Sequence, residues 1–239
     1  ALWGLVKLYS SSRASGWPLP VLVGIGLAFE GLLLIVRGIK SGAFPLTGLF
    51  ESLILLTLVF GLLYLFLSTA LKRIWFTVSG VFVLVVIVLM ASLVAIPASS
   101  PQAIAATPWA VVHGIAMIFG LMLTAFSAST GLLYVLCKHK LKNKQTRLVL
   151  GKMPNLETLE RMNLIGLQGG FVLITCGLVS GLGMAVINSA ALEASIAGWL
   201  GDPKIILMEF LWVVLGAVLV LKYFQAVKTR TVSYAVAGA

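Results

Sequence analysis

Apolar residues fill the chain in long uninterrupted runs, and polar residues gather between those runs. Most runs reach the roughly 20 residues that a helix needs to cross about 30 Å of hydrocarbon. Strand-like alternation of apolar and polar positions is absent, which favours helices over a barrel. The pattern predicts six membrane-spanning helices at residues 18–38, 49–70, 74–96, 108–137, 162–188 and 205–224.

The composition agrees with a membrane protein. Hydrophobic residues make up 60% of the 239 residues, charged residues only 10%, and the mean hydropathy is +1.10. This apolar content exceeds what a water-soluble core of this size buries. We therefore predict an all-α fold, a polytopic helix bundle that forms a single integral membrane domain over residues 1–239.

Basic residues are concentrated in a few connecting segments, which predicts the orientation of the chain. A formal charge of +10 is typical of proteins that bind nucleic acids. Here, however, the basic residues lie in loops that the positive-inside rule places in the cytoplasm. We expect a basic cytoplasmic loop at residues 138–161, cytoplasmic N and C ends, and no nucleic-acid partner. Membrane lipids are the expected partners of these charges, with binding of anionic lipid as the minor alternative.

Two polar side chains interrupt the first two apolar runs. Glu30 lies well inside the first run, where it is either a packing group bonded to a neighbouring helix or a proton-handling or ion-handling site. Glu51 follows Thr47 at the start of the second run, a position typical of a helix-start residue. Neither residue alone predicts a chemical activity.

Two histidines and two cysteines complete the candidate chemistry. His113 lies near the outer end of the fourth span, where it is either an interhelical hydrogen-bonding group or a metal ligand, and His139 lies in the basic loop and is expected to be solvated. Cys137 and Cys176 fall at different depths, so no disulfide is expected. No nucleophile–base pair or metal-binding spacing is visible, so we predict no catalytic residue and expect no enzymatic activity.

Two features surround the fifth span. Residues 153–163 have apolar positions at helical spacing, which predicts a short interfacial helix that leads into the span. The span itself has Gly166 with Gly170 and Gly177 with Gly181, pairs that allow a second helix to come close. We expect these glycines to serve helix packing.

Several motifs together resemble the cytochrome c assembly protein family, the CcsA/ResC/CcmC group with the related HemX-like proteins. The most specific is the nine-residue string from Phe44 to Ser52, and the segment from Met153 to Asn163 also matches almost position for position. The resemblance extends from about Val21 to Arg230 in the family's order. It implies a haem-handling fold and a bacterial-type cytoplasmic (inner) membrane or the organellar equivalent.

The same resemblance implies a haem site at the outer surface. It makes His113 an external haem iron ligand, and it makes Trp199 and Asp202 part of a haem-binding loop at residues 189–204. That loop departs from the family's pattern, because the positions of two of its tryptophans and its glutamate carry Ser195, Gly201 and Ile205. The following Trp212 is kept.

The family's membrane-embedded haem ligands are replaced. Glu30 and Val220 stand where the family has the two histidines of that site, and an aliphatic side chain cannot ligate iron. Of the four ligand positions that the family uses, this chain keeps only His113. The cofactor that the resemblance implies is therefore a haem held at the outer surface.

Three functional hypotheses follow from these residues. The first is a divergent cytochrome c assembly protein that handles or delivers haem at the outer membrane surface, with an apocytochrome c as its partner. The alternative is a non-catalytic accessory subunit of a larger membrane complex that has lost haem binding. The weakest is a transporter centred on Glu30, which would need inverted repeats or interrupted helices.

Overall fold

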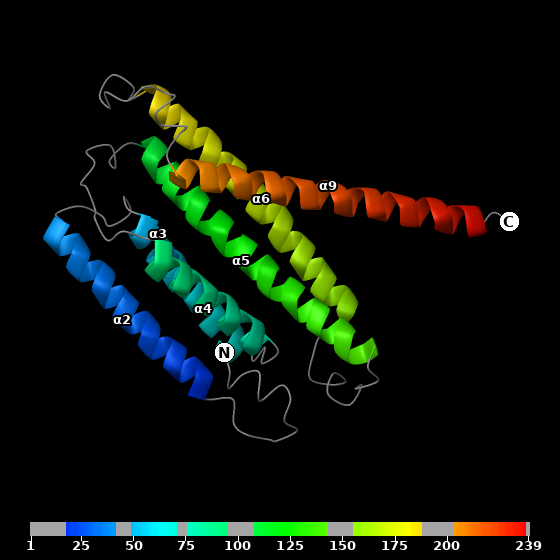
Figure 1. Ribbon diagram of the computed structural model, residues 1–239, viewed down its shortest axis with the longest axis horizontal. Coiled ribbons are helices and arrows are strands. Elements are labelled where there is room, and N and C mark those ends of the chain that lie inside the picture. Colours follow the sequence, from blue (N-terminus) through cyan, green and yellow to red (C-terminus); the bar gives the residue numbers. More distant parts are fainter. Residues whose placement is uncertain are drawn as a thin grey trace.

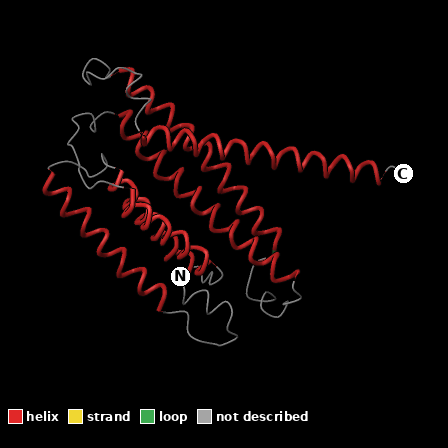
Figure 2. The backbone as a smooth tube through the Cα atoms, in the orientation of Figure 1, coloured by secondary structure: helices red, strands yellow, loops and turns green. Residues whose placement is uncertain are grey.

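The computed structural model describes residues 18–41, 49–70, 76–94, 108–142, 155–187 and 203–237. Every described residue except Asn155 is helical, as predicted (Figure 2). The helices are α2 (Pro18–Ser41), α3 (Leu49–Leu65), the π-helical turn η1 (Phe66–Ala70), α4 (Phe76–Val94), α5 (Pro108–Lys142), α6 (Leu156–Ile187) and α9 (Pro203–Ala237).

The predicted polytopic membrane architecture is confirmed. Within the described residues, five stretches of helix are long and apolar enough to cross a membrane, namely Leu19–Lys40, Phe50–Thr69, Trp109–His139, Leu156–Val186 and Ile205–Phe224. The remaining helix, α4, carries a shorter apolar stretch, Ser79–Leu93. Each predicted span coincides with one of these helices, so the chain is an integral membrane protein.

Helices that follow one another in the sequence pack against one another. α3 lies against both α2 and α4, α4 lies against α5, and the most extensive contact joins α5 to α6. α9 packs on α6, and its C-terminal part extends away from the other helices (Figure 1). The bundle is therefore built around α5, with α9 attached at one side.

Four helices extend beyond the predicted spans; α2 ends at Ser41 and α9 at Ala237, and the extensions of α5 and α6 have identifiable causes. α5 continues past Cys137 to Lys142, and its basic last turns suit the negative end of the helix dipole. α6 begins at Leu156, so the predicted short interfacial helix is not a separate element. Asn155 caps this helix, because its side-chain Oδ1 accepts a hydrogen bond from the Thr158 amide at 2.8 Å. Between Leu156 and Gly166 the sequence has no glycine or proline that would interrupt the helix.

An aromatic core joins α3, α4 and α5. Phe60, Tyr64 and Phe76 are fully buried. The Phe76 ring lies between neighbours from both other helices, with ring centroids 6.3 Å from Phe60 and 5.6 Å from Phe126. Tilted rings at these separations pack favourably, so this core fixes the three helices side by side.

The contact between α5 and α6 depends on glycines. A Cβ atom added at Gly120 would lie 2.9 Å from Cγ1 of Ile174 and 3.0 Å from its main-chain nitrogen. At Gly170 an added Cβ would lie 2.7 Å from Oγ1 of Thr124. The two helices therefore approach at distances that only glycine allows, as the small-residue pairs predicted.

Replacing Gly120 by alanine is expected to lower the free energy of unfolding by about 1–3 kcal/mol, because over-packing forces the two helices apart. The measurement is thermal unfolding of the full chain in mild detergent. Gly114→Ala on the same helix is the matched control, since a Cβ there meets nothing within 4 Å. Equal melting temperatures for the two variants would contradict the prediction.

Candidate functional site

His113 lies close to the start of α5, one helical turn after Trp109. Its ring is half-buried and faces α6, where Nδ1 lies 2.7 Å from the main-chain oxygen of Gly177. This contact joins two helices across 64 positions of the sequence. The sequence alone did not predict that His113 bonds to α6.

The bond also determines which ring nitrogen carries the proton. A carbonyl oxygen only accepts hydrogen bonds, so Nδ1 of His113 must donate, and Nε2 of the neutral ring keeps its lone pair. Nε2 makes no hydrogen bond with any described residue. Metal-ligating histidines commonly donate their other ring nitrogen to a backbone carbonyl in this way. The described geometry therefore leaves Nε2 able to bind a metal.

Small residues of α6 allow the ring to reach the backbone. A Cβ at Gly177 would lie 2.8 Å from Sδ of Met117, so the two helices are in close contact at this level. At Gly183 an added Cβ would lie 3.5 Å from the Trp109 ring, which is 46% exposed. Trp109 and His113 thus both lie against glycines of α6.

The other residues expected at the outer haem site are only partly described. Trp199 and Asp202 lie outside the described residues, so their place relative to His113 stays a prediction. Trp212 is described, and its ring stacks on Phe171 with centroids 5.5 Å apart while Nε1 donates to Oγ1 of Thr175 at 2.8 Å. Trp212 therefore holds α9 on α6.

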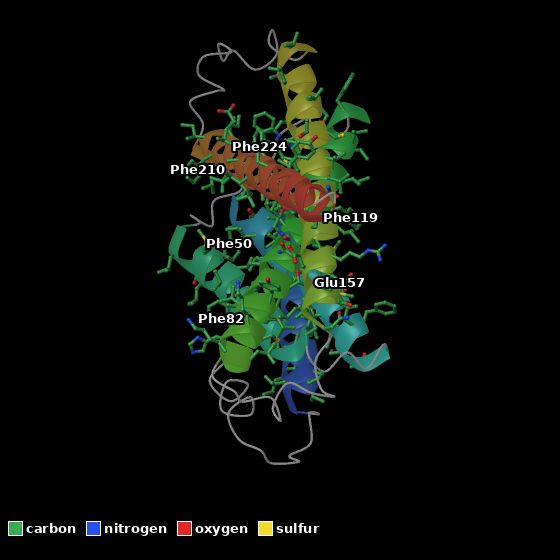
Figure 3. All side chains as sticks on the ribbon, turned by 90° about the vertical axis from the view of Figure 1, so that its right-hand side faces the viewer. Phe50, Phe82, Phe119, Glu157, Phe210 and Phe224 are labelled. Carbon is green, nitrogen blue, oxygen red and sulfur yellow. The ribbon has the colours of Figure 1, made fainter. Side chains whose placement is uncertain are left out.

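Much of the remaining surface of α9 is apolar and exposed. Val220, which the resemblance aligns with one of the family's embedded ligand positions, is 54% exposed. Phe210 and Phe224 lie on the same helix and are 67% and 64% exposed (Figure 3). Such side chains suit contact with lipid or with another apolar helix.

Glu30 lies on α2, as the first apolar run predicted, and its side chain is partly buried. Its Oε2 atom is shielded from solvent and has no hydrogen-bond partner among the described residues. The expected bond to a neighbouring helix is thus not seen at this oxygen within the described part of the chain. No metal-binding group of three histidine, cysteine or acidic side chains occurs there either.

Glu51 makes an ion pair that its place at a helix start did not predict. It lies in the first turn of α3 and is 1% exposed, and its Oε1 accepts a hydrogen bond from Nη2 of Arg37 at 2.7 Å. The Arg37 guanidinium also lies 5.3 Å from the centroid of the Phe50 ring. The pair ties the end of α2 to the start of α3.

A second polar cluster joins α5, α6 and α9. The Asn163 amide donates to the main-chain oxygen of Ser127 at 2.7 Å and to its hydroxyl at 2.9 Å. Oδ1 of Asn163 accepts a hydrogen bond from Nζ of Lys222 at 2.7 Å. The three residues are distant in sequence, so the sequence does not show that they meet. Its only signal is that each is a polar residue in or beside an apolar run.

The remaining residues of chemical interest stand apart from these clusters. His139 is exposed near the end of α5. Cys137 is buried, Cys176 is exposed, and neither forms a disulfide. Among the described residues, His113 is therefore the side chain best placed to act as a metal ligand.

The fold and this site define a polytopic helical membrane protein that presents one histidine nitrogen near the start of a spanning helix. Residues 46–239 match the cytochrome c assembly protein family, so the chain belongs to that family. A similar protein is the cytochrome c biogenesis protein CcsA of Guillardia theta, 29% identical over 210 residues that cover 79% of this chain and 67% of that protein. No solved structure matches the chain. Family membership places the chain in cytochrome c biogenesis.

Removing the carboxylate of Glu51 is expected to destabilise the protein strongly. Glu51→Ala leaves the Arg37 charge without its buried partner, and breaking such a pair costs about 3–5 kcal/mol. The measurement is thermal unfolding in mild detergent, with the exposed Glu160 changed to alanine as the control. The double variant Arg37→Met, Glu51→Leu should lose less stability than Glu51→Ala. A Glu51→Ala protein as stable as the control would contradict this role.

Proposed function

We propose that this protein handles haem at the outer surface of the membrane, and that His113 would bind the haem iron. The observation that carries the proposal is the hydrogen bond from His113 Nδ1 to the Gly177 oxygen at 2.7 Å. It holds the ring by one nitrogen and leaves Nε2 available, which is the arrangement that a ligating histidine needs. Family membership supports the same cofactor.

The described residues would supply one iron ligand and part of a surface for the haem ring. His113 would bind the iron, and the exposed face of Trp109 offers an apolar ring one turn away. Trp199 and Asp202, in the loop at residues 189–204, would complete the contact. When bound, the haem supplies an iron centre and a vinyl-bearing ring for attachment to protein thiols.

The chain's own part is binding, orientation and presentation. No step requires a nucleophile or a general base from this protein, so the proposal is for assisted delivery of haem to an apocytochrome c. The basic end of α5, with Lys138 and Lys142, belongs on the cytoplasmic side by the positive-inside rule. That orientation would place His113 near the outer surface of a bacterial cytoplasmic membrane or its organellar equivalent.

One observation favours the alternative of an accessory subunit. Trp212 follows the proposed haem loop, yet its ring and its nitrogen are both engaged with α6. Glu30 and Val220 stand at the two positions that the resemblance assigns to the embedded haem ligands, and neither is a histidine. An accessory subunit would co-purify with partner subunits and would be indifferent to the loss of His113.

Changing His113 to alanine is expected to reduce bound haem to background, because the substitution removes the proposed iron ligand. The measurement is a reduced-minus-oxidised absorption spectrum of the full chain, purified in mild detergent after reconstitution with haem. His139→Ala is the matched control, since its exposed side chain takes no part in the proposed site. It should retain the wild-type spectrum.

Two results would count against the proposal. A wild-type protein that stays free of haem under reconstitution would contradict haem handling. A wild-type spectrum in a folded His113→Ala protein would contradict the ligand assignment, and the melting temperature of each variant shows whether it is folded. Absence of haem together with fixed partner subunits would support the accessory role.

A further inference from the structure

We propose that Ser180 is a positioning residue for His113, acting through the Gly177 oxygen that both side chains contact. It would set the strength of the hydrogen bond from Nδ1 to that oxygen. Through the ring, it would thereby set the strength of Nε2 as a metal ligand. This inference rests on the proposed function of His113.

Two side chains from different helices meet at one main-chain oxygen. Nδ1 of His113 lies 2.7 Å from the Gly177 oxygen, and the Ser180 hydroxyl donates to the same oxygen at 3.0 Å. Ser180 is only 2% exposed, so water does not compete for its hydroxyl. Gly177 also lies inside α6, where its oxygen is positioned to take the main-chain bond of the next turn. Three donors therefore converge on an oxygen with two lone pairs.

Sharing an acceptor weakens each of its hydrogen bonds. The electron density that the Gly177 oxygen gives to the Ser180 hydroxyl is withdrawn from the Nδ1 proton of His113. A strong hydrogen bond from Nδ1 raises the electron density at Nε2, and this makes the imidazole a stronger ligand for a metal. Ser180 therefore lowers the ligand strength of His113 without contacting His113 or the iron.

A helical serine often bonds a carbonyl of the preceding turn. Ser180 is distinguished by its acceptor, the Gly177 oxygen, which His113 also contacts. Ser129 on α5 makes the same kind of local bond, with its hydroxyl 2.9 Å from the Ala125 oxygen. It is fully buried, and that oxygen has no histidine bonded to it. Ser129 is thus a matched control for the loss of a buried helical hydroxyl.

The first test needs no haem. The chain has two histidines, so a His139→Gln background with ¹⁵N-labelled histidine gives the signals of His113 alone. In Ser180→Ala the Nδ1 proton signal should move to lower field, because the Gly177 oxygen then binds that proton more strongly. Ser129→Ala should leave the signal in place. Ser180→Cys, with a weaker donor, should give an intermediate shift.

The second test measures the haem midpoint potential of the full chain. A stronger imidazole donor favours the oxidised iron, so Ser180→Ala should lower the potential, and Ser129→Ala should leave it unchanged. Unchanged proton signal and potential in a folded Ser180→Ala protein would overturn the role of Ser180 while leaving haem binding intact. If the wild type binds no haem, the proposed function fails, and the proton signal alone decides whether Ser180 acts on His113.

Discussion

The close approach of α5 and α6 is the constraint on which the rest of the structure depends. Gly120 and Gly170 bring the two backbones together at distances where a side chain would collide. Because the helices are this close, the His113 ring reaches a main-chain oxygen of α6 and the Asn163 amide reaches Ser127 on α5. Helix packing and the presentation of the candidate ligand thus have one cause.

The same helix pair also holds α9. Trp212 stacks on Phe171 of α6, and Lys222 donates to Asn163 further along. The hydrogen bonds of Trp212 Nε1 to Thr175 and of Lys222 to Asn163 satisfy polar groups in apolar surroundings, where water is not available to replace a lost partner. The Asn163 cluster therefore connects α5, α6 and α9, and any shift of α6 would be transmitted to the helix that follows the proposed haem loop.

Local patterns predicted the helices well and their long-range contacts poorly. Run length located the spans, and the spacing of Gly166 and Gly170 predicted a close helix contact. The spacing of apolar residues at 153–163 predicted a helix that leads into the span, and the structure has one continuous helix from the Asn155 cap onward. Neither the Arg37 partner of Glu51 nor the α6 partner of His113 was predicted, since such pairs depend on how the helices pack.

The central claim is that α6 holds His113 by Nδ1 and leaves Nε2 available for a metal. It is tested most directly by nuclear magnetic resonance of the haem-free chain in lipid, with ¹⁵N in the His113 ring and ¹³C in the Gly177 carbonyl. The account predicts a protonated Nδ1 in hydrogen-bond contact with that carbonyl and an unprotonated Nε2. A ring protonated at Nε2 alone, or one with Nδ1 far from Gly177, would contradict it.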